Sequence, residues 1–405
     1  MNTATLTASV PMRQDAAIVG LVGLAHAASH FSHLLLPLMF PVFVNEFGLR
    51  YSELGLLMTV YFAISGLGQA GAGFLVDRKG ARPVLFASMA LLLLACLLAA
   101  AADGYALLVV VAATAGLANA PFHPVDFTIM NQRVSPQRLG HAFSVHGLTG
   151  NLGWALAPVF FAIATRLSDW RGAYLCAAAM YGAILLLLLA HRDKLSTQSA
   201  QPKAGRQPAH DLAFMRLPVL WWCFGFFLLS TMTLAMVQSF AIPLLKALHG
   251  VPFETASMTL SAYSLCAAAG MLAGGFVAAR TLHSDKVVAS CMAAAAGCLL
   301  LCASAVLDAT GTMAVLAATG FAIGIGGPSR DMMIKRATPA GATGRVYGMV
   351  YSGLDVGFAI APVAFGMLMD RGLYRLTFFA AAMLMLLSAL VALGVGRRIG
   401  PPAPG

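Results

Sequence analysis

Twelve apolar segments, each close to the length that crosses a bilayer, divide this chain of 405 residues almost from end to end. A spanning helix needs about 20 mostly apolar residues, and lipid offers its backbone no other hydrogen-bond partners. The sequence therefore predicts an all-α polytopic membrane protein. The predicted helices cover roughly residues 16–44, 51–76, 83–102, 105–132, 140–165, 172–190, 218–246, 252–279, 286–308, 312–334, 344–369 and 373–395.

Composition and charge support this class and orient the chain. Charged residues make up 10% of the sequence, where a soluble protein carries roughly 25%. With both termini inside, eighteen of the 25 lysines and arginines are cytoplasmic and six lie opposite, with Arg330 left within a helix. This asymmetry follows the positive-inside rule. It predicts a multi-pass inner (plasma) membrane protein with cytoplasmic termini, and it explains the net charge of +10 without a nucleic-acid site.

An internal repeat divides the chain into halves. A displacement of 202 positions superposes Gly48 on Gly250, Tyr61 on Tyr263, Gly73 on Gly275 and Arg78 on Arg280. Repeats of this kind are typical of secondary transporters. The predicted domains are an N-terminal six-helix bundle (1–191), a cytoplasmic linker (192–217), a C-terminal six-helix bundle (218–396) and a disordered tail (397–405).

A charged turn follows the second predicted helix. It reads Gly-x-x-x-Asp-Arg-x-Gly-x-Arg, with its fixed positions at Gly73, Asp77, Arg78, Gly80 and Arg82. Together with twelve helices and a basic linker, this motif resembles the major facilitator superfamily. The resemblance implies two bundles that rock about a central site, and a gating latch between the Asp77 carboxylate and the start of the eleventh helix, near Gly344 and Arg345. A helix N-terminus and an adjacent cation both stabilise a carboxylate. A solvated hairpin turn is the alternative.

Other stretches narrow the resemblance. The histidine-containing runs that begin at His26, Phe122 and Phe143 are similar to the fosmidomycin-resistance-like branch of the superfamily. The fifth predicted helix resembles the antiporter motif of drug exporters in the spacing of Gly147, Gly150 and Gly153. It departs from that motif at Ala157, so close helix packing explains the glycines equally well.

Ionisable side chains inside the predicted helices mark the candidate site, because a charge at the bilayer centre costs roughly 2.5–3.5 kcal/mol. In the first helix His26, His30 and His33 follow the i, i+4, i+7 spacing of one helix face. In the fourth helix the same spacing recurs at Asn119, His123 and Asp126. In the repeat, Pro328 aligns with Pro124, which places Arg330 at the position of Asp126.

The family resemblance implies that the first, fourth, seventh and tenth helices line a central cavity. Candidate substrate- or proton-binding residues are His26, His30, His123, Asp126, Arg330, Asn119, Asp355 and His146. Arginine binds carboxylate or phosphonate through two hydrogen bonds, and histidine and aspartate exchange protons near neutral pH. Three alternatives stay open. His33 and His146 could be structural hydrogen bonders, Arg330 could pair locally with Asp331, and Asp355 could be an inter-bundle contact.

These observations predict a monomeric, proton-coupled secondary transporter of a small anionic or zwitterionic solute or drug, with drug/proton antiport favoured. The alternatives are an uptake symporter for an organic acid, a divalent-metal transporter that uses the histidines, and a non-transporting solute sensor. No catalytic motif such as His-Glu-x-x-His occurs, so no enzyme is predicted. The seven cysteines all fall in apolar segments without a Cys-x-x-Cys pair, and neither a cofactor nor a resident metal is expected.

Overall fold

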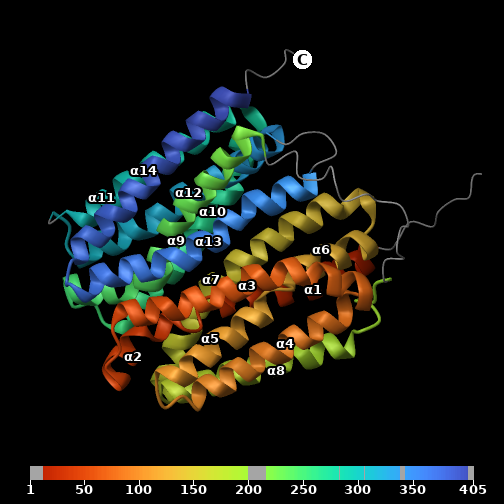
Figure 1. Ribbon diagram of the computed structural model, residues 1–405, viewed down its shortest axis with the longest axis horizontal. Coiled ribbons are helices and arrows are strands. Elements are labelled where there is room, and N and C mark those ends of the chain that lie inside the picture. The colour runs from red at the N-terminus through yellow and green to blue at the C-terminus, as the bar shows by residue number, and fades with distance from the viewer. Residues whose placement is uncertain (1–11, 199–215, 282, 305, 338–342, 400–405) are drawn as a thin grey trace, which may run out of the picture.

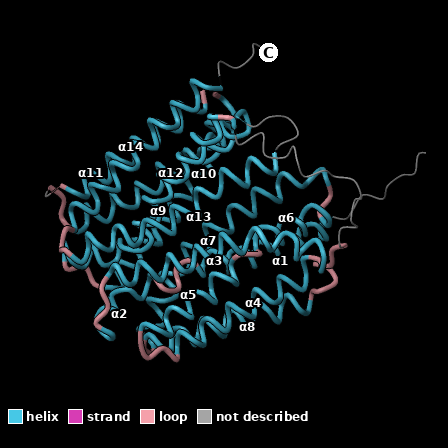
Figure 2. Tube along the Cα trace, viewed as in Figure 1, coloured by secondary structure: helices cyan, strands magenta, loops and turns pink. Residues whose placement is uncertain are grey.

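The computed structural model consists of helices and their connections throughout its described part (Figure 2). It describes residues 12–198, 216–281, 283–304, 306–337 and 343–399, and the backbone alone at 70, 74, 77, 137, 140 and 343–348. The α-helices are α1 (Met12–Ser32), α2 (Phe40–Phe47), α3 (Tyr51–Lys79), α4 (Ala81–Ala100), α5 (Tyr105–Asn119), α6 (Phe122–Arg133), α7 (Leu139–Leu167), α8 (Trp170–Ala190), α9 (Pro218–His249), α10 (Phe253–Arg280), α11 (Ser284–Ala303), α12 (Ala309–Ala337), α13 (Thr343–Asp370) and α14 (Tyr374–Ile399). Short 3₁₀ turns cover Pro37–Met39 and Pro136–Arg138.

The helices form two groups that lie side by side. Figure 1 shows α1–α8, coloured red to yellow-green, next to α9–α14, coloured green to blue. The groups touch mainly through α3 against α13 and through α7 against α10. We call the end of the helices that carries residues 191–198 the linker end. The opposite end, where α3 begins and α13 finishes, is the far end.

The predicted helices are confirmed with small changes in their ends. Eleven helical segments of the described residues are long and apolar enough to cross a membrane. The twelfth predicted segment corresponds to α3, which is 29 residues long and lies among the others (Figure 1). Length and apolar character were therefore sufficient to locate the helices.

Two of the predicted helices are interrupted, and proline explains both breaks. The segment predicted at 16–44 ends as α1 at Ser32, passes through a tight turn before Pro37, and resumes as α2. The segment predicted at 105–132 breaks into α5 and α6 next to Pro121. Proline has no N–H to donate to the preceding turn and its ring clashes there. In the second half Ile325 occupies the position of Pro121, and α12 stays continuous through Pro328.

The sequence repeat has a counterpart in backbone geometry. Gly48 and Gly250 end α2 and α9 with φ values of 65° and 66°, in the left-handed region that favours glycine. Within each group one glycine also allows two helix backbones to touch. A methyl group at Gly116 would lie 2.3 Å from the Tyr61 carbonyl oxygen, and one at Gly320 would lie 2.1 Å from that of Tyr263. The two halves therefore repeat specific contacts as well as their order of helices.

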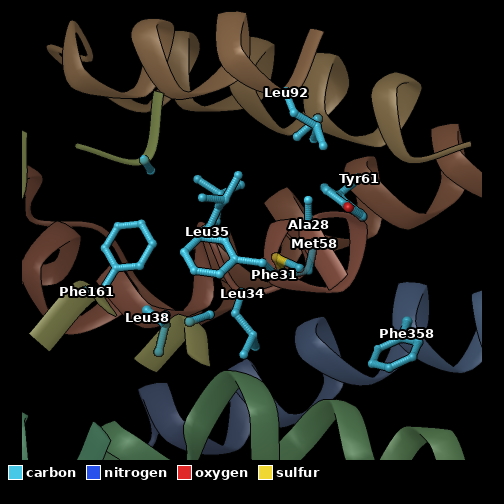
Figure 3. Close-up of a cluster of buried hydrophobic side chains, with 14 of the residues drawn as sticks. Ala28, Phe31, Leu34, Leu35, Leu38, Met58, Tyr61, Leu92, Phe161 and Phe358 are labelled. Carbon is cyan, nitrogen blue, oxygen red and sulfur yellow. The ribbon is translucent and has the colours of Figure 1, made fainter. Parts of the chain in front are cut away.

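The apolar core of the first group surrounds the break after α1. Figure 3 shows Phe31, Leu34, Leu35 and Leu38 close to Leu92 and Phe161, with Phe358 of α13 approaching from the other group. These side chains are nearly inaccessible to solvent. The break is thus enclosed by side chains, and the backbone groups it leaves without helical partners lie inside protein and not in lipid.

Candidate functional site

Asp126 of α6 is the centre of a polar cluster inside the first group. Its side chain is 0% exposed, although it forms no ion pair with any lysine or arginine that the structure describes. Oδ2 lies 3.0 Å from Nε2 of His146, with which it forms a hydrogen bond, and 3.2 Å from Nδ1 of His26. Oδ1 has no hydrogen-bond partner among the described residues. A buried carboxylate with an unused acceptor is costly, so this site has capacity for a further donor such as a proton.

Histidine rings surround this carboxylate on three helices. The rings of His26 and His146 stack with centroids 3.6 Å apart, and His30 lies 4.4 Å from His26. His123 lies 5.6 Å from His26 and is exposed, in contrast to the buried pair. His146, for which a structural role was the alternative, is a direct partner of Asp126.

Close packing between α1 and α7 creates the space for these rings. A methyl group at Gly153 would lie 2.2 Å from the Ala27 carbonyl oxygen, so the two backbones touch. A methyl group at Gly150 would lie 2.7 Å from Cε1 of His30 and 3.1 Å from Nε2 of His26. The interpretation as packing residues agrees with this geometry for Gly150 and Gly153, whereas a methyl group at Gly147 would have no described atom within 4 Å. Gly150 and Gly153 hold two histidines of α1 against the helix that carries His146.

His33 stacks on His30, with ring centroids 5.1 Å apart, and also belongs to a hydrogen-bonded network. Trp154 Nε1 donates to its Nδ1 at 3.3 Å, and its Nε2 lies 3.3 Å from Asn119 Oδ1. Because indole N–H only donates, Nδ1 must accept, and the proton therefore resides on Nε2. Asn119 also accepts from Ser29 and donates to Ser65, at 2.6 Å and 2.9 Å. His33 and Asn119 thus join α1, α3, α5 and α7 through hydrogen bonds, and the binding role of Asn119 stays a prediction.

Arg330 of α12 lies in the second group, with partners of its own. Its Nε is 2.9 Å from Asp331 Oδ1, and its guanidinium lies 5.1 Å from the ring centroid of Phe227. Tyr351 donates to the same Asp331 oxygen at 3.3 Å. The local pairing with Asp331 is therefore what the structure contains, and no described contact joins Arg330 to Asp126. Because 29% of its side chain is exposed, the Arg330 guanidinium can still donate hydrogen bonds to an anionic ligand.

Asp355 of α13 faces the first group. A methyl group at Gly66 of α3 would lie 3.2 Å from its Cβ. Asp355 is half-buried and has neither an ion pair nor a hydrogen bond among the described residues. The carboxylate is therefore an available acceptor at the contact between the two groups.

The predicted gating motif lies at the linker end, where α3 passes into α4. Gly80 has a φ of 79° between the two helices, and Arg82 donates to the Arg192 carbonyl at 3.4 Å. Arg78 is exposed. The side chains of Asp77 and Arg345 lie outside the described residues, so the predicted latch stays a prediction.

Other residues near the site escaped the sequence reasoning. Asp15 is buried at the start of α1, where it accepts from Arg138 Nε at 2.7 Å and from Ser135. Trp154 and Tyr351 orient ionisable partners. Aromatic and short-range polar residues of this kind have no distinctive spacing in the sequence. The cluster at Asp126 also has a spacing that a metal ion would accept, because ligand atoms of His26, Asp126 and His146 lie within 4.8 Å of one another.

Known proteins resemble this chain over most of its length. The family model of the Major Facilitator Superfamily matches residues 22–314 and 229–405. The fosmidomycin resistance protein of Escherichia coli is 25% identical over 391 residues, which cover 93% of this chain and 92% of that protein. A probable nitrate/nitrite transporter, NarK2 of Mycobacterium tuberculosis, is 25% identical over 338 residues, which cover 81% and 82%.

Solved structures agree on the fold. A bacterial homologue of the human lysosomal transporter Spinster, in an inward-facing and occupied conformation, superposes with a TM-score of 0.78 at 14% identity and covers 96% of this chain and 98% of that one. The nucleoside transporter NupG gives a TM-score of 0.77 at 14% identity, with 94% and 99% coverage. These two likenesses concern architecture alone.

Proposed function

The chain belongs to the major facilitator superfamily, and on that premise we propose that it moves a small anionic or zwitterionic solute across the inner membrane in exchange for protons. Members of this family are secondary transporters of small solutes and not enzymes. In the proposal, 1–191 and 218–396 are the two moving bundles, the chain acts as a monomer, and the linker end is cytoplasmic. The exchange direction corresponds to export.

The observation that carries the proposal is the fully buried Asp126 carboxylate, held between two imidazoles and unsatisfied at Oδ1. A charge at this depth is unfavourable unless the group has a role. Carboxylate and imidazole together can bind and release a proton without a large rearrangement. The titratable groups around them are His26, His30 and His33 of α1, Tyr61 of α3, His123 of α6 and His146 of α7. None of these carries a permanent charge.

Arg330 supports the solute class. Its guanidinium is permanently charged, partly exposed and flanked by the Phe227 ring. Arginine in such a position favours carboxylate, phosphonate or nitrate over neutral solutes, because it offers a planar set of donors. The names of two relatives are consistent with anions, since one is a probable nitrate/nitrite transporter and another confers resistance to fosmidomycin.

The test begins with binding and then measures coupling. Thermal-shift titration of the purified protein with nitrate, fosmidomycin and a panel of carboxylates identifies a bound solute. Proteoliposomes with an imposed pH gradient then compare wild type with Asp126→Asn. We expect gradient-driven accumulation to be lost in the variant, while counterflow of the solute without a gradient persists. Asp103→Asn, an exposed aspartate in the turn after α4, serves as the matched control.

Two results would change the conclusion. Unchanged gradient-driven accumulation in Asp126→Asn would remove this carboxylate from proton coupling. The alternative substrate is a divalent metal ion. A thermal-shift titration with zinc as the sole added solute distinguishes it from an anion. Stabilisation by zinc that disappears in Asp126→Asn, together with zinc uptake into vesicles, would favour metal over an anion.

A further inference from the structure

The contact between α3 and α13 is closed at the far end. A methyl group at Gly55 would lie 2.3 Å from the Pro362 carbonyl oxygen, and one at Gly366 would lie 2.6 Å from that of Tyr51. Phe62 and Phe358 stack across the contact with their centroids 4.4 Å apart. Thr59 donates to the carbonyl of Ala359. Backbone, aromatic and polar contacts thus follow one another along half of each helix.

Toward the linker end, two glycines of α3 have open space beside them. A methyl group at Gly71 or Gly73 of α3 would have no described atom within 4 Å. The equivalent glycine of the second group, Gly275 of α10, also has none. The close backbone contacts that Gly55 and Gly366 mark between α3 and α13 thus lie at the far end.

The outermost contact at the far end is an ion–backbone interaction between the two groups. Asp370, the last residue of α13, accepts from the Tyr51 N–H at 2.6 Å and from the Ser52 N–H at 3.1 Å. These are the first two N–H groups of α3, which have no acceptor within their own helix. The neighbouring Arg50 N–H donates instead to Glu53 at 2.8 Å. Asp370 thus supplies, from the second group, acceptors for two N–H groups of the first group.

We infer that Asp370 is a positioning residue for transport, because its carboxylate holds the far end of the two groups closed. A negative charge at a helix N-terminus interacts favourably with the helix dipole and with the free N–H groups. When the groups separate at this end, water must replace the carboxylate at Tyr51 and Ser52. Asp370 is exposed, so the interaction is weak enough to break in each cycle.

The inference rests on alternating access by the two groups, which the proposed function assumes, and not on the solute or the coupling ion. The test therefore uses neither. Spin labels at Asn45 and Arg375, both exposed at the far end in opposite groups, are introduced into the full chain with its native cysteines replaced. A second labelled pair, at Lys79 and Arg397, reports on the linker end. Distance distributions are measured by EPR in nanodiscs.

We expect Asp370→Ala to lower the ratio of far-end-closed to far-end-open molecules by about fivefold to thirtyfold. The linker-end distances should shorten in parallel. Asp370→Glu, which keeps the charge, should recover most of the closed population. The matched control is Asp169→Ala, which removes a helix-capping aspartate at the same end, where Asp169 accepts from Gly172 at 2.7 Å within one group.

The inference is overturned if Asp370→Ala and Asp169→Ala give the same far-end distances as wild type. It is also overturned if both variants change those distances equally, because a general loss of helix stability would then explain the effect. Failure of the proton or anion tests would leave these distances unaffected, so the two proposals fail separately.

Discussion

Gly55 offers a direct way to open the far end without touching any charge. In Gly55→Ala the new methyl group would lie 2.3 Å from the Pro362 carbonyl oxygen, whereas ordinary contacts begin at 3.4 Å. Relief requires α3 and α13 to separate by about 1 Å, which a rigid backbone contact cannot absorb locally. Overpacking of this kind costs about 1–3 kcal/mol. In the open conformation the same methyl group is accommodated, and alanine is the better helix former.

The expected result is a fall in the closed-to-open ratio of about fivefold to more than a hundredfold, measured with the Asn45 and Arg375 labels. Two controls use the same substitution in the same group. Gly73→Ala meets nothing within 4 Å and should leave the distances unchanged. Gly116→Ala has an equally short contact, 2.3 Å to the Tyr61 oxygen, but within one group, so it should lower thermal stability without opening the far end. Wild-type distances in Gly55→Ala, or a stability loss like that of Gly116→Ala, would refute the reasoning.

Two further predictions concern the sites themselves. Arg330→Gln should weaken binding of an anionic solute by about tenfold or more, since hydrogen bonds to charged groups contribute about 1.5–3 kcal/mol. Binding of a neutral solute should change little. Isothermal titration with a matched pair of solutes checks this, and equal losses of affinity for both would contradict it. Trp154→Phe keeps the ring but removes the donor to His33 Nδ1, so it should reduce thermal stability by about 1 kcal/mol and leave gradient-driven transport intact. Uncoupled transport in that variant would show that His33 is more than structural.

The fold was largely predictable because the bilayer fixes the length of its elements. Apolar segments predicted the helices. The repeat paired Gly48 with Gly250, and the structure shows that both are left-handed helix ends with nearly the same φ. The breaks beside Pro37 and Pro121 were missed, although each proline was visible. A proline can also be accommodated as a kink, as Pro328 is, so its outcome depends on the surrounding packing.

The sequence was sufficient to predict which residues form the candidate site, but it predicted only some of the contacts between them. The histidine stripe on α1 followed from helix periodicity, and its proximity to Asp126 was implied by the family resemblance. The bond between Asp126 and His146 followed from neither, because it depends on how α6 and α7 turn toward one another. Alignment of the halves suggested that Arg330 faces Asp126, yet Arg330 has Asp331 beside it in the chain. An ion pair between neighbouring residues orders less of the chain than one between distant residues, so it costs less conformational entropy.

The backbone contact at Gly116 has a mechanical consequence. Two helices that touch through their main chains have no side-chain rotamers to rearrange between them, so α3 and α5 move as a single stiff element. Gly153 fastens α7 to α1 in the same way, and α6 joins α5 directly to α7. The Asp126 carboxylate and the imidazoles around it therefore belong to one rigid unit. In the proposed cycle, rocking would change the water that reaches them and the groups that face them from the second bundle, while their mutual geometry would stay the same.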